Sequence, residues 1–453
     1  MISRTEVGRM AALFLRAETV LPLGETNAVW SPGAVRIEDG TIVEAGPAGA
    51  VSSAGAAEID VGRAVLVPGL CNAHTHLYSS LARGLPPRGP DPRTFREILE
   101  TLWWRWDKLL DPDTVALSAE AGLLESARRG VTAVNDHHAS PSAIDGSLDR
   151  IAEAAGAIGL RAALAYETTD RDGFAKRDQG LAENARFAAR AAADRSGRIA
   201  ATIGAHASLT LGEESLAELV RLAALTGRPL HLHMDEGPED GEGARRGGDR
   251  STVGRLARAG VLRPGTIVAH AVHVDDRDIE ILAETKTVVV HNPRSNGGNA
   301  VGRAPLGALL RAGVRLALGT DGMSGAVAID AAVAGAVHRM AEKDRAIPFD
   351  LPFRLAAERN AEVASALFGI RYGSIAPGFA GDVVAYAYRP PTPIRPENVA
   401  AHWMLGISES PVTHVVVSGE PVLVEGTFVR VDEEEILDRT RAAADRLRNA
   451  FHA

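Results

Sequence analysis

Histidine and aspartate side chains follow short apolar runs in this sequence, at positions where buried strands would end. His74 and His76 close the first run, His233 and His270 follow two later runs, and Asp321 follows the last. Residues two apart on a strand share a face, so the imidazoles of His74 and His76 can bind one ion. Three imidazoles and one carboxylate leave a coordination position open for water. The pattern therefore predicts a catalytic rather than a structural metal site.

Glu236 lies three residues after His233, on the same predicted turn from strand to loop. A carboxylate there can lie close to the ion without binding it, as a proton shuttle requires. The alternatives are a hydrogen-bonded core histidine at His233, a helix-terminal charge at Glu236 and a helix N-cap at Asp321. The repetition of such residues at several strand ends favours the metal site.

The elements that must position these residues alternate between short apolar runs and helical segments from about residue 70 onward. After the first run come runs at 131–135, 161–166, 199–203, 229–232, 266–269, 287–290 and 315–318, with helical segments such as 112–129, 212–226 and 303–312 between them. Eight strand-then-helix units over roughly 300 residues predict a closed (β/α)8 TIM barrel, whose active site lies where the carboxyl ends of the strands meet. A doubly wound open sheet shows the same alternation and is the alternative.

Strand-like segments also flank the barrel on both sides. They lie at 11–19, 34–38, 41–45 and 64–67 before it, and at 382–387, 414–418, 422–424 and 427–431 after it. A helix is expected at 433–451. We therefore expect residues 69–376 to form the barrel, and residues 1–68 and 377–453 to form one small β domain that includes the C-terminal helix.

The composition excludes several classes of protein. The chain has 453 residues and a net charge of −9, which argues against general binding to nucleic acid or anionic membranes. A single cysteine, Cys71, excludes disulfide frameworks and cysteine zinc sites. No phosphate-binding loop, Gly-x-Ser-x-Gly or His-Glu-x-x-His motif is present. No run of 18 apolar residues occurs, and Arg16 and Glu18 interrupt the only N-terminal apolar run, so we expect a cytoplasmic protein.

These motifs, taken in order, resemble those of the amidohydrolase superfamily. The segment 67–70 leads into His74-Thr75-His76, and His233 with Glu236, His270 and Gly319-Thr320-Asp321 follow. Within the superfamily the chain is similar to the aminohydrolase branch, which includes guanine, 8-oxoguanine, cytosine and S-adenosylhomocysteine deaminases and triazine chlorohydrolases. The resemblance covers nearly the whole chain and implies a TIM barrel with a β-sandwich domain built from both ends.

A finer resemblance is to the SsnA-type aminohydrolases. It rests on four segments: 103–107, 136–141, 167–171 and 292–296. Those proteins are associated with gene neighbourhoods of purine and selenium-dependent hydroxylase metabolism, so the resemblance points to purine metabolism. It does not specify a substrate.

The superfamily resemblance also implies roles for individual residues. The implied metal ligands are His74, His76, His233 and Asp321. Glu236 would be the proton shuttle, His270 would orient the attacking hydroxide with Asp321 accepting its proton, and His206 would contact substrate.

Four further residues are candidates for substrate contact. Arg294 and Asn296 follow the seventh run and can donate to ring carbonyl groups, although loop hydrogen bonding would explain them equally well. His137, at the end of the second strand, would face the mouth or play a structural part. Trp103 lies in the long insertion after the first strand, where its ring could stack on a flat substrate or pack in a helix core.

The distribution of lysine bears on the number of ions. Dinuclear amidohydrolases carry a carbamylated lysine at the end of the fourth strand, but this chain has no lysine at 204–208 and only four in all. One divalent ion is therefore expected, Zn²⁺ before Fe²⁺. Glu167, at the end of the third strand, keeps a second ion open as an alternative.

The implied reaction is hydrolytic deamination of an electron-poor nitrogen heterocycle such as a purine or pterin. The alternatives are ring-amide opening or dechlorination at the same site, and a non-catalytic metal-binding protein. The expected partners are a small heterocyclic substrate and a second copy of the chain in a homodimer or larger homo-oligomer, with no nucleic acid or membrane.

Overall fold

The computed structural model describes residues 12–24, 26–86, 88–322, 324–342 and 347–453. The start of the strand expected at 11–19 lies outside these residues. No helix among the described residues is long and apolar enough to cross a membrane.

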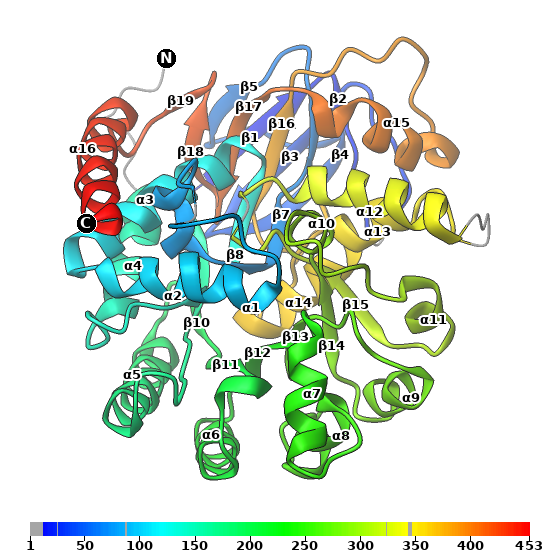
Figure 1. Ribbon diagram of the computed structural model, residues 1–453. Coiled ribbons are helices and arrows are strands. Elements are labelled where there is room, and N and C mark those ends of the chain that lie inside the picture. Colours follow the sequence, from blue (N-terminus) through cyan, green and yellow to red (C-terminus); the bar gives the residue numbers. More distant parts are fainter. Residues whose placement is uncertain (1–11, 25, 87, 323, 343–346) are drawn as a thin grey trace.

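Two parallel sheets form the middle of the chain (Figure 1). The first has the order β10-β9-β8-β7, made by Ile199–Ala201, Arg161–Tyr166, Val131–His138 and Leu70–Thr75. The second has the order β11-β12-β13-β14-β15, made by Ile203–Ala207, Leu230–Met234, Ile267–His270, Val288–His291 and Arg315–Leu318. Each apolar run in the sequence thus becomes a buried strand. The run at 199–203 is divided between β10 and β11, which are interrupted at Thr202.

Backbone hydrogen bonds join the two sheets at both of their edges. At one edge, the amides of Thr320 and Asp321, which follow β15, donate to the carbonyl of His74 on β7 at 3.0 and 3.1 Å. At the other edge, Thr168 after β9 pairs in parallel with Ala205 on β11. The first and last of these strands are therefore neighbours, and the carboxyl ends of all of them are turned to one side.

Helices surround the two parallel sheets (Figure 1). They are α3 (Pro112–Arg128), α4 (Ser147–Ile158), α5 (Phe174–Ala193), α6 (Glu213–Thr226), α7 (Pro238–Arg246), α8 (Thr252–Arg258), α9 (Asp276–Glu284), α10 (Pro293–Gly298), α11 (Leu306–Arg311), α12 (Val327–Glu342), α13 (Leu351–Arg354) and α14 (Asn360–Phe368). Local chemistry sets their ends. Asp111 and Thr114 form a capping box at the start of α3, and Gly159 closes α4 with φ of 102°.

A second layered unit combines both ends of the chain. One sheet has the order β4-β3-β1-β5, from Thr41–Pro47, Gly33–Glu38, Ala12–Ala17 and Ala57–Asp60. The other has the order β19-β18-β17-β16-β6-β2, from Thr427–Phe428, Glu420–Val424, Val412–Val417, Val383–Tyr386, Val65–Pro68 and Thr19–Val20. Leu15 and Val35 of the first sheet share an apolar core with Leu66 and Val416 of the second.

Two helices border this second unit: α15 (Val399–Leu405) and the C-terminal α16 (Glu433–His452). The helix α16 packs along α3 (Figure 1). Asp432 caps its first turn by accepting from the amide of Glu435 at 3.2 Å.

The insertion after β7 lies over the carboxyl ends of the parallel strands. It contains short helical segments at Leu77–Ala82, α1 (Phe95–Ile98), Leu99–Trp103, α2 (Trp104–Trp106) and Asp107–Leu109. Trp106 is its buried anchor, with Nε1 donating to the carbonyl of Tyr78 at 3.1 Å. The rest of the insertion forms one wall of a cavity at these strand ends.

Candidate active site

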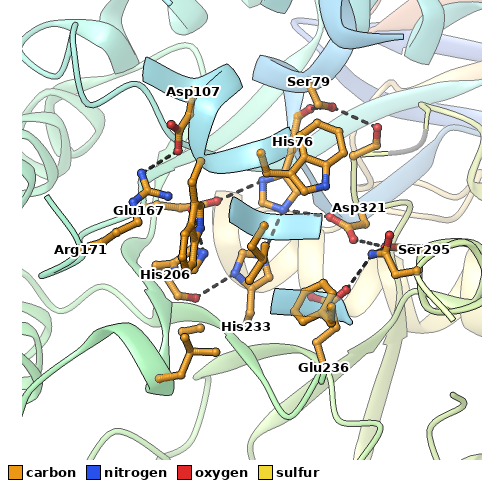
Figure 2. Close-up of a pocket in the computed structure, with 18 of the residues that line it drawn as sticks. His76, Ser79, Asp107, Glu167, Arg171, His206, His233, Glu236, Ser295 and Asp321 are labelled. Carbon is orange, nitrogen blue, oxygen red and sulfur yellow. Dashed lines mark hydrogen bonds and ion pairs between the residues drawn. The ribbon is translucent and has the colours of Figure 1, made fainter. Parts of the chain in front are cut away.

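Six of the residues predicted for the site converge at the carboxyl ends of the parallel strands. They come from β7, β12, β13 and the segments that follow β7, β12 and β15: His74, His76, His233, Glu236, His270 and Asp321. The His76 and His233 Nε2 atoms are 3.0 Å apart, and His76 Nε2 is also 3.0 Å from Asp321 Oδ1 (Figure 2). His74 Nε2 lies 3.8 Å from the same carboxylate oxygen.

Hydrogen bonds to backbone carbonyls fix which nitrogens carry protons. His76 Nδ1 donates to the carbonyl of His137 at 2.6 Å, and His233 Nδ1 donates to the carbonyl of His206 at 2.9 Å. In the neutral imidazoles, the facing Nε2 atoms therefore both carry lone pairs. Two lone pairs and a carboxylate oxygen at 3.0 Å repel one another unless a cation lies among them.

The donor set fits a divalent metal ion. Zinc bonds of 2.0–2.1 Å in a tetrahedral arrangement place neighbouring ligand atoms about 3.3 Å apart. The distances of 3.0 Å and 3.8 Å around Asp321 Oδ1 bracket that value. His74 Nε2 is buried and has no hydrogen-bond partner among the described residues, as expected of an atom reserved for a metal bond. His74 Nδ1 pairs with His231 Nε2 at 2.8 Å, which holds the ring in place.

Without a metal, one proton takes the place of the ion. Although burial lowers it, hydrogen bonding and charge from Asp321 raise the pKa of His76 to about 9. Burial would raise the pKa of Asp321, but His76 holds it far below its usual range, so this carboxylate is ionised. Burial, with smaller effects of neighbouring histidines, lowers the pKa values of His74 and His233 well below the usual value.

Glu236 and His270 form a second pair beside the ion site. His270 Nδ1 hydrogen-bonds Asn296 Oδ1 at 2.8 Å, so Nε2 is the bare nitrogen, and it lies 3.2 Å from Glu236 Oε2. Asn299 donates to Glu236 Oε1 at 3.1 Å. Burial raises the pKa of Glu236 well above its usual range, and the charge of Asp321 adds to this effect. Glu236 therefore carries a proton that its Oε2 atom can present to His270 or to a ligand.

Two of these residues adopt backbone conformations that side chains disfavour. His270 has φ of 79° and Asp321 has φ of 55°, both in the left-handed region. Such conformations cost about 1–2 kcal/mol each and concentrate at functional sites, where the surroundings hold them. At Asp321, the side chain receives a hydrogen bond from Ser295 Oγ on Oδ2, which leaves Oδ1 directed at the ion site.

A cavity of about 760 Å³, counted with its open mouth, lies against the ion site. The insertion after β7 contributes Tyr78, Ser79, Phe95, Leu99, Trp103, Trp104 and Asp107 to its lining. The strand ends contribute His76, Glu167, His206, His233, Glu236 and Asp321.

The structure brings two of the predicted substrate contacts to this cavity. His206 and Trp103 both line it. His206 also holds Thr210 through Nδ1 at 2.8 Å, and burial lowers the pKa of His206 to about 4. A neutral imidazole at this position can accept or donate a hydrogen bond to a ring.

Three other predicted contacts do not line the cavity. Arg294 is paired with the fully buried carboxylate of Asp330, with Nε at 2.9 Å. The Asn296 amide accepts from His270 and so holds a site residue rather than a substrate. His137 is fully buried beside Glu167, with its Nδ1 3.1 Å from Oε1, and Nε2 donates to a backbone carbonyl.

Sequence reasoning missed several cavity residues. Asp107, Trp104 and Arg171 line the wall opposite Glu236, and Ser295 and Asn299 support Asp321 and Glu236. Asp107 and Arg171 lie in segments noticed only for their resemblance to SsnA-type proteins, whereas Trp104 was considered with Trp103 as a residue that could stack on a substrate ring. Strand periodicity carries no signal for them, because Trp104 and Asp107 lie in short helical turns and Arg171 lies five residues beyond the end of β9.

Comparisons with known proteins agree with this geometry. A model described as the amidohydrolase family matches residues 65–422. The 5'-deoxyadenosine deaminase of Methanopyrus kandleri is 31% identical over 395 residues, which cover 86% of this chain and 88% of that protein. The 5-methylthioadenosine/S-adenosylhomocysteine deaminase of Pelotomaculum thermopropionicum is 29% identical, with 97% and 100% covered.

Solved structures give the same picture of the fold. A zinc-bound adenosine deaminase from Xanthomonas campestris superposes with a TM-score of 0.85 at 25% identity, covering 96% of this chain and 98% of that one. Atrazine chlorohydrolase TrzN from Arthrobacter aurescens has a TM-score of 0.81 at 22% identity, covering 95% and 100%. At that identity, the second likeness concerns the fold alone.

Proposed function

Because this chain belongs to the amidohydrolase family, we propose that it is a metal-dependent aminohydrolase that removes an exocyclic amino group from a nitrogen heterocycle by hydrolysis. The observation that carries this proposal is the convergence of imidazole Nε2 atoms on Asp321 Oδ1, with a protonated Glu236 beside them. An ion site flanked by an acid and a base at the end of a cavity suits attack by water on a bound ring.

The residues that would hold the ion are His74, His76, His233 and Asp321. Zn²⁺ is the proposed ion, because its preferred ligands and distances match this set. A bound divalent ion of this kind supplies Lewis-acid chemistry, lowering the pKa of a water molecule from 15.7 towards 7. One ion is proposed, since no lysine is available at the end of the fourth strand.

Asp321 and His270 would act on the attacking water. Asp321 is ionised, and its Oδ2 atom is held by Ser295, so it is positioned to accept a proton from water near Oδ1. His270 would orient that water through Nε2, which its bond to Asn296 leaves without a proton. The water oxygen then bonds to the ring carbon that carries the amino group.

Glu236 would move the proton to the leaving group. It enters the reaction protonated and can donate to the ring nitrogen next to the attacked carbon. The proton that Asp321 took from water passes to the amino group, the carbon–nitrogen bond breaks and ammonia leaves. The proton left on the attacking oxygen returns to Glu236, and the ring keeps a lactam. General acid–base catalysis of this kind contributes about 10²–10⁴-fold in rate.

The relatives favour adenine nucleosides within this substrate class. The M. kandleri and P. thermopropionicum proteins are named for 5'-deoxyadenosine and for 5-methylthioadenosine and S-adenosylhomocysteine. A purine is therefore the substrate class that we propose first, in agreement with the purine metabolism expected from the sequence. The finer likeness to SsnA-type aminohydrolases stays a prediction.

Ammonia release tests the proposal directly. Zinc-loaded protein is assayed on adenine nucleosides, guanine, pterins, cytosine and aminotriazines, alongside Glu236→Gln. Ammonia from at least one compound, lost in the variant, supports deamination. Chloride or a new carboxylate in place of ammonia would support dechlorination or ring opening instead.

We also propose that the two parallel sheets close into one eight-stranded barrel and that the two outer sheets form a β-sandwich. The hydrogen bonds at both edges of the parallel sheets and the shared apolar core of the outer sheets support these assignments. The domain boundaries, the cytoplasmic location and the homodimer or larger homo-oligomer expected from the sequence stay predictions.

A further inference from the structure

The polar side chains near the two ends of α12 face the interior of the molecule. Asp330 and His338 are both fully buried. Asp330 accepts from Arg294 Nε at 2.9 Å, and the Nε2 atoms of His338 and His291 share a hydrogen bond of 2.9 Å. A helix on the surface of a globular protein normally turns such groups towards water and its apolar stripe towards the core. The helix α12 is therefore not built as an ordinary surface helix.

The outward side of α12 is a stripe of apolar side chains. Ile329, Ala332, Ala336, Val337 and Met340 are all exposed, and Met340 is 78% exposed. Their spacing places them on one side of a helix with 3.6 residues per turn. We call these five residues the α12 stripe.

Neighbouring elements extend this apolar surface. Figure 1 shows α13 and α15 on the same side of the molecule as α12, and α13 packs against both of the other helices. Phe349, just before α13, and Leu405, at the end of α15, are exposed. Among the described residues eight large apolar side chains are exposed, and five of them belong to α12, α15 and the segment before α13. Apolar residues gathered in this way mark an interaction site, whereas those scattered singly need no partner.

The dimensions of this surface suit another protein chain. The helix α12 has 16 residues and is about 24 Å long. Neighbouring helices lie 8–10 Å apart, so α12 with the elements beside it presents a face of roughly 500 Å². Two such faces in contact bury about 1,000 Å² in all, which is the area that a specific protein interface needs.

The chemistry of the stripe favours a second copy of this chain as the partner. A charged partner would find no counter-charge there, because Asp330 faces inward and Arg339 Nη1 donates to the carbonyl of Ile347 at 3.1 Å. The stripe is also complementary to itself. Small residues, Ala332 and Ala336, lie in its middle, and the large Ile329 and Met340 lie at its two ends. Two antiparallel copies of α12 can therefore approach closely at the alanines, with Ile329 of each copy beside Met340 of the other.

We propose that two copies of this protein form a dimer by packing α12 against α12 about a two-fold axis that passes between Ala332 and Ala336. The same patch is used on both chains, as a closed two-fold interface requires. Phe349 and Leu405 widen the contact on either side. The interface does not depend on which reaction the enzyme catalyses.

Sedimentation velocity of the zinc-loaded protein over micromolar concentrations tests the dimer. Ala336→Glu should leave the monomer folded, because Ala336 is exposed and glutamate is a good helix former. In the dimer it places two unpaired carboxylates close to the axis, so we expect the dissociation constant to rise by about 100-fold or more. Thermal melts followed by circular dichroism show whether the variant is folded, and Met340→Glu is the second variant if it is not.

The helix α6 supplies matched controls, since it lies away from α12 (Figure 1). Leu225 of α6 is 77% exposed, almost as much as Met340, so Leu225→Glu adds the same charge to a comparable surface and should keep the dimer. A short bismaleimide should link two copies of Ala336→Cys, whereas Ala224→Cys on α6 should stay unlinked. The native Cys71 is buried and does not compete for the reagent.

Three results together support the interface: a dimer in the unchanged protein, its loss in Ala336→Glu but not in Leu225→Glu, and linkage through Ala336→Cys. A protein that stays monomeric at every concentration, or that associates only with a different protein, would overturn the proposal. So would a dimer that persists in folded Ala336→Glu and Met340→Glu proteins, or one that Leu225→Glu weakens equally. Absence of ammonia from every compound counts against deamination alone, because the measured mass still tests the interface.

Discussion

When zinc binds to the metal-free protein at pH 7, His76 should release close to one proton per ion, separately from any proton lost by a water molecule on the ion. The carboxylate of Asp321 keeps this imidazole protonated when no ion is present, and a metal bond to Nε2 requires that nitrogen to be bare. His74 and His233 contribute no proton, because their pKa values are lowered well below the usual value.

The magnitude follows from the pKa of about 9 for His76. Roughly 99% of the molecules carry this proton at pH 7 and about half carry it at pH 9. Over this interval the apparent zinc affinity should rise about tenfold per pH unit, equivalent to ~1.4 kcal/mol. The proton released by His76 should fall to about one half near pH 9 and vanish above it.

The same proton stabilises the metal-free fold. A histidine whose pKa rises from 6.5 in the unfolded chain to about 9 in the fold contributes stability that is complete below about pH 6.5. This contribution is lost as the pH rises through 9 and amounts to about 3 kcal/mol. Zinc-loaded protein, in which His76 Nε2 carries no proton, should show no such loss.

Titration calorimetry in two buffers with different heats of protonation measures the number of protons released. The titration is repeated with Glu236→Gln, because Glu236 also holds a proton near the ion and could release it. A value near zero at pH 7 in this variant would refute the proton-for-metal exchange at His76.

Three further predictions concern single residues. Glu236→Gln should lower kcat by about 10²–10⁴-fold while metal analysis still finds one ion per chain, because this carboxyl acts on protons rather than on the ion. Asn296→Ala should lower kcat, because His270 loses the hydrogen bond that keeps its proton on Nδ1. Steady-state kinetics and metal analysis should find KM and zinc content nearly unchanged. Arg294→Ala should leave kcat/KM of the folded protein unchanged but destabilise it by about 3 kcal/mol in denaturant titrations, because the buried carboxylate of Asp330 loses its partner.

Each of these three predictions has an outcome that would contradict it. Loss of zinc in Glu236→Gln would make this residue a ligand. A rise in KM alone in Asn296→Ala would indicate that this side chain contacts substrate, as predicted from the sequence. Likewise, a stable Arg294→Ala protein with a raised KM would place the guanidinium in substrate binding.

The strands and the ion site were predictable because one rule governs both. Short apolar runs become parallel strands whose carboxyl ends share one edge, so any polar residue just after a run reaches the same place. His74, His233 and Asp321 were found this way. Membership of the amidohydrolase family, first indicated by these motifs, is confirmed by the family model and the relatives.

The same rule predicts neither the direction in which a side chain turns nor the residues that the insertion after β7 brings to the cavity. Position after a strand end does not distinguish a side chain that faces the cavity from one that turns to a neighbour. Asn296 turns to His270, and Arg294 turns to Asp330, because a buried imidazole N–H and a buried carboxylate need those partners. Asp107 and Trp104 belong to short helical turns without periodicity, and only their packing over the strand ends brings them to the cavity.

The arrangement of the outer sheets has a consequence for synthesis of the chain on the ribosome. Strand β6 ends at Pro68, but its neighbour β16 begins at Val383, so all the parallel strands are made in the interval. At 5–20 residues per second, β6 waits roughly 15–60 s for that neighbour. During this time the N-terminal strands carry an open edge that can pair with other nascent chains. A protein truncated before Val383 would keep that edge permanently and should aggregate even if its parallel sheets form.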